Sequence, residues 1–157
     1  SWDVNFGVEF NGANIVVEAD GKYQVQLTWD GAQNGTVELS GMSVKSETDF
    51  AVVALSSLTD DPIENSQHML LSTIGRARNS GAQFDGEKMI DVGHAPIVSE
   101  VIQADIEIKT NQSDLRVWGV NAEGYYVGKL PTTYEDGWLK FHVGDSFPAS
   151  HYLIMAE

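Results

Sequence analysis

The fold class is decided by the stretch Ile15-Val16-Val17-Glu18-Ala19-Asp20-Gly21-Lys22-Tyr23-Gln24-Val25-Gln26-Leu27-Thr28-Trp29. From Tyr23 to Trp29 apolar and polar side chains alternate, which places successive side chains on opposite faces of a strand. The dipeptide Asp20-Gly21 before this run is a turn signal, because glycine readily adopts a positive φ. The stretch therefore predicts two antiparallel strands joined by a tight turn.

The same two-residue period recurs along the whole chain, separated by Asn-Gly, Asp-Gly and Glu-Gly pairs. The expected strands are 2–10, 36–39, 50–55, 69–74, 97–102, 105–109 and 139–143. Trp2 and Trp29 share the phase of the apolar side chains, so we expect both to be buried. Many short strands at this spacing predict an all-β fold, an antiparallel β-sandwich of jelly-roll type, built as one domain over residues 1–157.

Two segments depart from the strand pattern. The segment 60–66 is the only one that suggests a helical turn, because prolines and β-branched residues interrupt helical stripes elsewhere. The segment 79–96 is rich in glycine and charge. We expect it to be a surface loop that crosses one end of the sandwich.

Composition excludes several classes of function. The 9 Lys and Arg residues stand against 23 Asp and Glu, and the net charge of −14 opposes binding to nucleic acid. The absence of cysteine excludes disulfides, thiolate zinc sites and thiol nucleophiles. A membrane-spanning helix needs about 20 apolar residues, and no apolar run of the chain approaches this length, so no membrane partner is expected. The chain opens directly into strand-like sequence, which predicts a module of a longer protein whose export signal lies elsewhere.

Enzyme signatures are weak. The four histidines lack metalloprotease spacing, and there is no nucleophile elbow and no phosphate-binding glycine loop. The acid pairs Asp60-Asp61 and Glu135-Asp136 fall in expected turns, where they would be solvated rather than facing each other across a cleft. We therefore expect no catalytic activity and no cofactor. The same acids leave a structural Ca²⁺ ion open, with no ligands assigned.

Aromatic placement is the most informative functional feature. In Trp138-Leu139-Lys140-Phe141-His142-Val143 the apolar set Leu139, Phe141 and Val143 takes the core face, so Trp138, Lys140 and His142 face the other way. A flat ring beside hydrogen-bond donors suits a sugar, whose apolar C–H face stacks while its hydroxyls need polar partners. The alternative is that Trp138 only caps the sandwich edge.

Two further rings are candidates for carbohydrate binding. Tyr125 and Tyr126 follow the turn 121–124. Strand alternation would send one of these rings inward and the other outward, and the sequence leaves open which one.

The stretch Met69-Leu70-Leu71-Ser72-Thr73-Ile74-Gly75-Arg76-Ala77-Arg78-Asn79-Ser80-Gly81 resembles the "LLLTAVGRAENTG" signature of a family of accessory domains. These β-sandwich domains accompany (β/α)₈-barrel glycoside hydrolases of the agarase and porphyranase type. The segments 93–101 and 117–124 resemble two further elements of that family, although Asn121 stands where the family usually has Asp. The resemblance runs from about Ala51 to the end and implies a β-sandwich in a polysaccharide context.

The resemblance also separates the two arginines of the signature. Arg76 matches an arginine that recurs in the family, which implies that it fastens loop carbonyls or a buried carboxylate. Arg78 stands where the family often has another residue, and its planar guanidinium suits paired hydroxyls or a sulfate. Arg78 therefore joins Trp138, Lys140, His142, Tyr125 and Tyr126 as a carbohydrate-binding candidate.

These features together predict a noncatalytic carbohydrate-binding module. By resemblance, it would anchor a secreted bacterial glycoside hydrolase, as a covalently linked domain, to an algal galactan such as agarose or porphyran. Its partners would be the polysaccharide and the linked catalytic domain, outside the cell. Two alternatives stay open: a module that binds a neutral β-glucan, and a purely structural accessory domain of a glycoside hydrolase.

Overall fold

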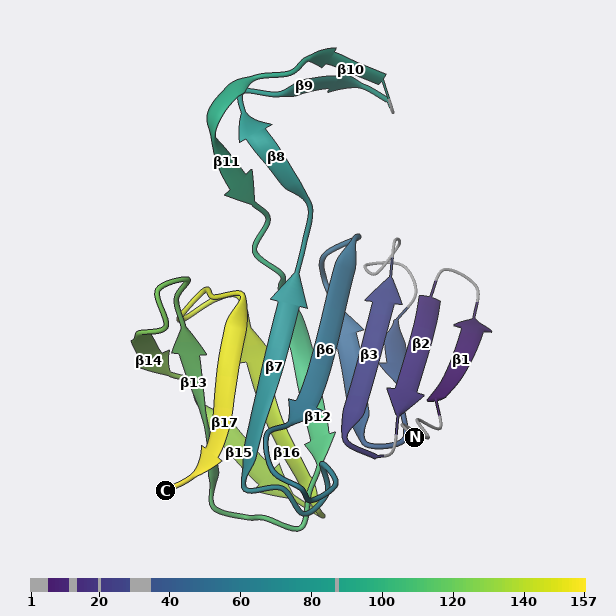
Figure 1. The fold of residues 1–157 in the computed structure, drawn as a ribbon, viewed down its shortest axis with the longest axis vertical. Helices are drawn as coiled ribbons and strands as arrows, with labels where there is room; N and C mark the ends of the chain where they lie inside the picture. Colours follow the sequence, from purple (N-terminus) through teal and green to yellow (C-terminus); the bar gives the residue numbers. More distant parts are fainter. Residues whose placement is uncertain (1–5, 12–13, 20, 29–34, 87) are drawn as a thin grey trace.

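The computed structural model describes residues 6–11, 14–19, 21–28, 35–86 and 88–157. In this part of the chain the regular structure is antiparallel β-strand, arranged as two sheets packed face to face with a strand-built projection at one end (Figure 1). No helix in the described residues is long and apolar enough to cross a membrane. The predicted all-β antiparallel sandwich is confirmed, while its jelly-roll connectivity stays a prediction. Trp2 and Trp29 lie outside the described residues.

The first sheet has eight strands in the order β1-β2-β3-β6-β7-β17-β13-β14. Their bounds in chain order are Phe6–Asn11, Asn14–Ala19, Tyr23–Thr28, Ala51–Ser57, His68–Ile74, Leu115–Val120, Tyr126–Lys129 and, for β17, His151–Ala156. The second sheet has five strands in the order β15-β16-β12-β5-β4. Its strands β4, β5, β12, β15 and β16 span Thr36–Glu38, Met42–Ser46, Ala104–Lys109, Thr132–Glu135 and Trp138–Val143. We call the two sheets together the body.

The hairpin that the opening stretch predicts is present. Strands β2 and β3 pair antiparallel with Ala19 opposite Tyr23, and Gly21 in the turn has a φ of 64°. The predicted helical turn near residue 63 is a single hydrogen-bonded turn, in which the Ser66 N–H donates to the Pro62 carbonyl at 2.9 Å. No helix continues from it.

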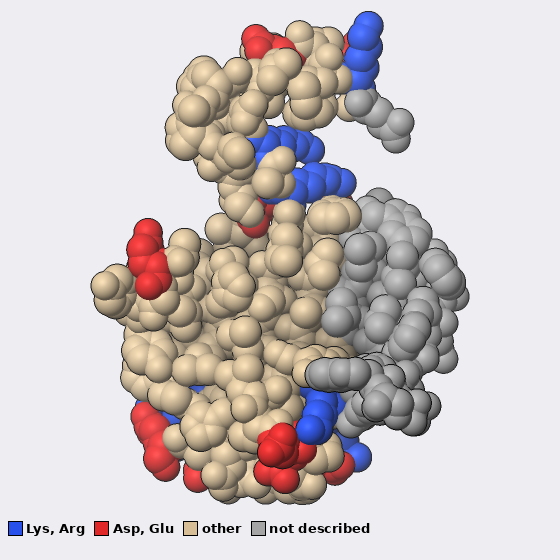
Figure 2. Space-filling view, in the orientation of Figure 1, with Lys and Arg blue, Asp and Glu red and all other residues tan. Residues whose placement is uncertain are grey.

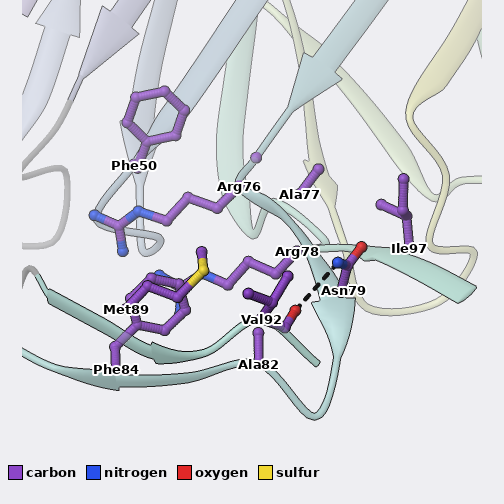
Figure 3. Close-up of a pocket in the computed structure, with 11 residues that line it drawn as sticks. Phe50, Arg76, Ala77, Arg78, Asn79, Ala82, Phe84, Met89, Val92 and Ile97 are labelled. Carbon is purple, nitrogen blue, oxygen red and sulfur yellow. Dashed lines mark hydrogen bonds between the residues drawn. The ribbon is translucent and has the colours of Figure 1, made fainter. Parts of the chain in front are cut away.

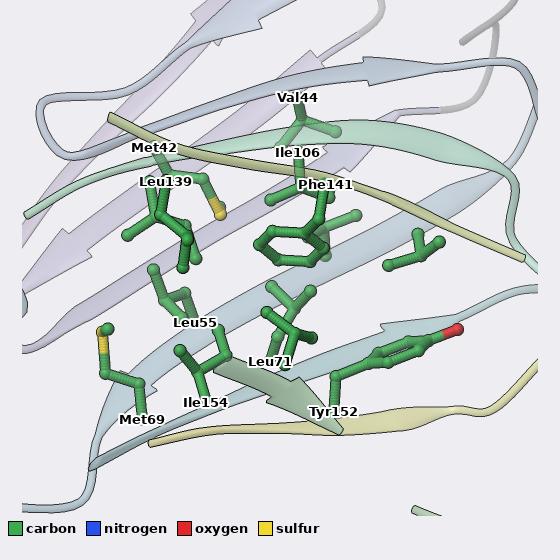
Figure 4. Packing of buried hydrophobic residues seen from close by; sticks show 14 of the residues in the cluster. Met42, Val44, Leu55, Met69, Leu71, Ile106, Leu139, Phe141, Tyr152 and Ile154 are labelled. Atoms are coloured by element: carbon green, nitrogen blue, oxygen red, sulfur yellow. The ribbon is translucent and has the colours of Figure 1, made fainter. Parts of the chain in front are cut away.

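The core lies between the two sheets, because alternate residues of each central strand point inward. Strand β6 buries Ala51, Val53 and Leu55, and β16 buries Leu139 and Phe141. Figure 4 shows Leu55, Leu139 and Phe141 among the side chains that fill the space between the two sheets. Each fully buried Val or Leu side chain contributes about 1.5 to 3 kcal/mol of burial free energy, so this layer stabilises the body.

Tyr152 is the largest fully buried side chain of the core, and it also carries a polar group. Its hydroxyl oxygen accepts a hydrogen bond from the Ala149 N–H at 3.2 Å. Burial raises the pKa of this hydroxyl and outweighs the backbone hydrogen bonds at Ala149 and Gly144, which lower it. The polar end of Tyr152 is therefore satisfied and uncharged inside the sandwich.

Residues 75–101 form an arm that projects from the body, which corrects the predicted surface loop over the sandwich end (Figure 1). The arm contains strands β8, β9, β10 and β11, which span Ala77–Ser80, Gln83–Asp85, Lys88–Asp91 and His94–Ser99. Strand β8 pairs with β11, and β9 pairs with β10. The Glu100 N–H donates to the Arg76 carbonyl at 2.8 Å, which holds the two ends of the arm together. Composition indicated the turns but not these long-range pairs.

Candidate functional site

Strand β16 carries Trp138, Lys140 and His142 on the outer face of the five-stranded sheet. Their half-buried side chains alternate with the buried apolar residues of the strand, so the outward placement predicted from the sequence is confirmed. Strand β12 runs beside β16 and places Glu107 opposite Lys140 and Asp105 opposite His142. Because directly opposed residues share a face, these two carboxylates join the row of basic side chains.

The row is held by one ion pair and one side-chain hydrogen bond between the two strands. The Lys140 Nζ atom lies 3.8 Å from Glu107 Oε1, and His142 Nδ1 lies 2.8 Å from Asp105 Oδ1. The second ring nitrogen of His142, Nε2, lies 3.5 Å from Asp145 Oδ2. These partners orient both basic side chains across the sheet. Lys140 keeps donor capacity for a further ligand, because an ammonium group has three N–H donors.

A groove runs along this row, which we call the outer groove. It encloses about 570 Å³ and is lined by β12, β16 and the beginning of β15, including Asp105, Glu107, Thr133, Lys140 and His142. Trp138 lies on the same face two residues before Lys140, at the end of the row. The groove thus alternates donors and acceptors, and Trp138 lies on the same sheet face without lining the groove. Its volume is within the range of about 300 to 1,000 Å³ typical of small-molecule sites.

One end of the row contains a group of potential metal ligands. Among the described residues, Glu47, Asp105 and His142 offer ligand atoms that all lie within 4.8 Å of one another. One imidazole nitrogen with two carboxylates suits a first-row transition ion better than Ca²⁺, which prefers six to eight oxygen ligands. Sequence reasoning missed Glu47 and Asp105, because only strand pairing brings them to His142.

Tyr125 and Tyr126 lie away from the outer groove. Both rings are exposed, Tyr125 by 71% and Tyr126 by 55%, so the prediction that one of them points inward is wrong. Tyr125 belongs to the turn before β14, where its N–H donates to Asn121 Oδ1 at 2.8 Å, so strand alternation does not apply to it. The Tyr126 ring lies 5.6 Å from that of Trp118, a residue of the eight-stranded sheet. The tyrosines are therefore not part of the outer groove.

Arg78 lies on the arm, in a third location. Its guanidinium stacks over Phe84 of β9, 4.4 Å from the ring centroid, and Arg76 lies over Phe50 of the body at 5.7 Å. Both arginines line a hollow of about 560 Å³ between the arm and the body, which we call the arm hollow (Figure 3). The expectation that the Arg76 side chain fastens loop carbonyls or a buried carboxylate finds no such contact among the described residues. Its side chain is exposed instead.

Charge is unevenly distributed over the molecule. In the described part of the face that Figure 2 shows, uncharged residues cover most of the eight-stranded sheet, and charged groups lie at the lower rim, at the upper left edge and on the arm. The basic side chains at the base of the arm point into the hollow beneath it. The six predicted site residues thus divide among three places: the outer row beside and in the outer groove, the exposed turn with Tyr125 and Tyr126, which we call the tyrosine turn, and the arm hollow.

Comparisons of the chain with protein-family models, with curated proteins and with solved structures found no match.

Proposed function

We propose that this chain is a noncatalytic carbohydrate-binding module and that the outer groove is its saccharide site. One observation carries the proposal: Trp138, Lys140 and His142 stand in a row on one exposed sheet face, beside a groove of about 570 Å³. A ring of Trp138 supplies a stacking surface for the apolar face of a sugar. The neighbouring charged side chains supply hydrogen bonds for its hydroxyls.

The charges of the outer groove favour a neutral sugar. Sugar hydroxyls both donate and accept hydrogen bonds, and Lys140 paired with Glu107 offers a donor and an acceptor side by side. Asp105 and His142 repeat this arrangement one step along the row. Because each base stands beside a carboxylate, the groove carries little net positive charge to attract an anionic polymer.

The same geometry supports a binding role rather than glycoside hydrolysis. A glycosidase needs two carboxyl groups that flank the scissile bond from opposite sides. Asp105 and Glu107 lie two residues apart on one strand and face the same way, each beside a basic partner. Such an arrangement suits a saccharide that lies along the sheet better than one cleaved between these two groups.

The biological setting of the proposal comes from the sequence resemblance. The polysaccharide would be an algal galactan such as agarose or porphyran, with a neutral β-glucan as the alternative. The module would be linked covalently to a secreted bacterial glycoside hydrolase and would hold it on the polymer. Such tethering raises the local substrate concentration without adding chemistry.

A second candidate, a structural accessory domain, is favoured by the arm. Ile90, Val98 and Val101 are exposed large apolar side chains that do not line the arm hollow. Exposed apolar residues gathered on one projecting element are typical of a docking surface. In this function the arm would pack against the linked catalytic domain, and the body would bind no sugar.

Affinity electrophoresis against agarose, porphyran and a β-glucan tests the proposed function. We expect retardation of the module in at least one polymer. Trp138→Ala should weaken this binding by about 1 to 3 kcal/mol, or about 5- to 150-fold, through loss of ring stacking. The control is Tyr125→Ala, which removes an exposed ring outside the groove and should leave retardation unchanged.

The outcomes separate the candidates. Migration of the unmodified chain at its normal rate in every gel would favour the structural accessory domain. Equal retardation of the Trp138→Ala variant, with an unchanged melting temperature, would remove the outer groove as the site. A loss of binding in the Tyr125→Ala variant alone would move the site to the tyrosine turn.

A further inference from the structure

The arm hollow brings together two of the three arginines of the chain. Arg76 and Arg78 lie two residues apart where the arm leaves the body, and both point into the hollow (Figure 3). Phe50 of the body lies beneath the first guanidinium, and Phe84 of β9 lies beneath the second. Stacking on a ring restricts a long side chain without using its N–H donors. Both guanidinium groups are therefore positioned while their donors stay available.

Neither guanidinium is held by an ion pair among the described residues, although Glu100 lines a smaller pocket together with both arginines. Elsewhere in the described residues Lys109, Arg116, Lys129 and Lys140 each lie within 4.0 Å of a glutamate carboxylate. The guanidinium groups of Arg76 and Arg78 form no ion pair with any described acidic residue. Glu100, at the base of the arm, instead accepts a hydrogen bond from the backbone N–H of Arg76 at 3.4 Å.

This local positive charge contrasts with the chain as a whole, whose net charge is −14. Two adjacent arginines without carboxylate partners form a site for an oxyanion, because each guanidinium can donate two parallel hydrogen bonds. Apart from Asn79, whose side-chain amide donates to the Val92 carbonyl at 3.1 Å, the remaining walls of the hollow are apolar and include Ala82 and Met89. A matching ligand therefore carries an anionic group and also an apolar face.

We infer that the arm hollow is a second saccharide site, selective for a sulfate ester carried on a sugar ring. The sulfate oxygens accept hydrogen bonds from Arg76 and Arg78, and the C–H face of the ring packs against the apolar wall. The inference rests on the proposed function for its polysaccharide context. It differs from the outer groove in ligand class, because the bases of that groove are already paired with carboxylates.

The experiment observes the arginine side chains directly. The Nε–H groups of the three arginines are followed by NMR in the ¹⁵N-labelled full chain, with Arg116 as an internal control because it is already paired with Glu157 at 3.4 Å. The probes are methyl galactoside 6-sulfate, unsulfated methyl galactoside and sodium sulfate. We expect saturable shifts of the Arg76 and Arg78 signals with the sulfated sugar, weaker shifts with sodium sulfate, and no response of Arg116.

Matched variants complete the test. Arg76→Gln and Arg78→Gln should each weaken binding of the sulfated sugar about tenfold or more, as expected when a charge-assisted hydrogen bond is lost. Arg116→Gln removes the same charge elsewhere and should leave that affinity unchanged. All three variants should keep the retardation in agarose that depends on Trp138, so a failure of the outer groove is measured separately.

Three results would overturn the inference. The first is no shift of the Arg76 and Arg78 signals with the sulfated sugar. The second is an equal response to sodium sulfate, which would make the hollow a site for a free anion only. The third is a shift that follows protein concentration without added sugar, which would show that a second copy of the chain occupies the hollow.

Discussion

The body and the arm are built from the same antiparallel strand pairs, yet they differ in what covers those strands. In the body, strand β7 buries Met69, Leu71 and Thr73 against the opposite sheet. In the arm, every described residue of β10 and β11 is exposed, including Ile97 by 71%. The comparison shows that backbone hydrogen bonds are enough to form a strand pair, whereas burial of its side chains requires a second sheet packed against it.

The arm is therefore the region whose conformation depends most on its surroundings. A two-stranded ribbon is only marginally stable by itself in water, because it buries little apolar area. Half of the large exposed apolar side chains among the described residues belong to the arm: Met89, Ile90, Val92, Ile97, Val98 and Val101. Any ligand or partner that covers them would stabilise the arm without changing the body.

The largest expected difference between the two regions is the cost of removing an apolar side chain. Leu71→Ala should lower the free energy of unfolding by about 2 to 5 kcal/mol, because it leaves a cavity in the core. Ile97→Ala, in the exposed strand of the arm, should change it by less than about 0.5 kcal/mol. Urea unfolding of both variants measures this. A similar loss in both would mean that the arm packs into the cooperative core.

A smaller effect is expected at Tyr152, where the body buries a polar group. Tyr152→Phe removes the acceptor of the Ala149 N–H and should cost about 0.5 to 1.5 kcal/mol at pH 7. Circular dichroism during urea unfolding measures this loss. An unchanged midpoint would mean that water replaces the hydroxyl as the acceptor.

The same residue predicts a pH dependence. Because burial raises the pKa of the Tyr152 hydroxyl, the folded chain holds this proton more tightly than the unfolded chain, in which the pKa is about 10. This contribution to stability is complete below pH 10 and is lost as the pH rises through the folded value. The melting temperature of Tyr152→Phe should therefore fall less steeply above pH 10 than that of the unmodified chain.

The smallest effect on stability is expected from removing the arm itself. The Arg76 carbonyl and the Glu100 N–H are already joined at 2.8 Å, so a short Gly-Ser link can replace residues 76–100. The unfolding free energy of the body should change by less than about 0.5 kcal/mol, since the removed segment contributes few buried side chains. Binding to agarose should persist and recognition of the sulfated sugar should disappear. A large loss of stability would show that the arm is part of the body.

The outward-facing row on β16 could be predicted from the sequence, although the groove beside it could not. Alternation along β16 correctly places Trp138, Lys140 and His142 outward, because the two-residue period of a strand is a local property. The partners of this row could not be predicted in the same way. Asp105 meets His142 across 37 residues of chain, through the register between β12 and β16. That register depends on the packing of both strands over the core.

The prediction for the tyrosine pair failed for a related reason. Alternation applies only inside a strand, and Tyr125 lies one residue before β14 begins at Tyr126. The side chain of Asn121 accepts the N–H of Tyr125 and so holds that residue in the turn. The position at which the turn ends and β14 begins therefore determines where both rings point. Side-chain alternation is least reliable at the ends of strands.

The sequence by itself determined most strands of the body, their inward faces and the all-β sandwich, because alternation and turn residues act over a few neighbouring positions. It did not determine the strands of the arm: the pattern predicts a loop over 79–96 and a strand over 97–102, whereas β11 spans His94–Ser99. Only the tertiary structure decided that the chain from Gly75 to Val101 leaves the body as an arm, and that Arg76 and Arg78 meet rings from two different segments there. The physical reason is the sequence distance over which each effect acts. Residue preferences depend on neighbouring positions, whereas strand register and the burial of a strand by a second layer depend on side chains far apart in the chain.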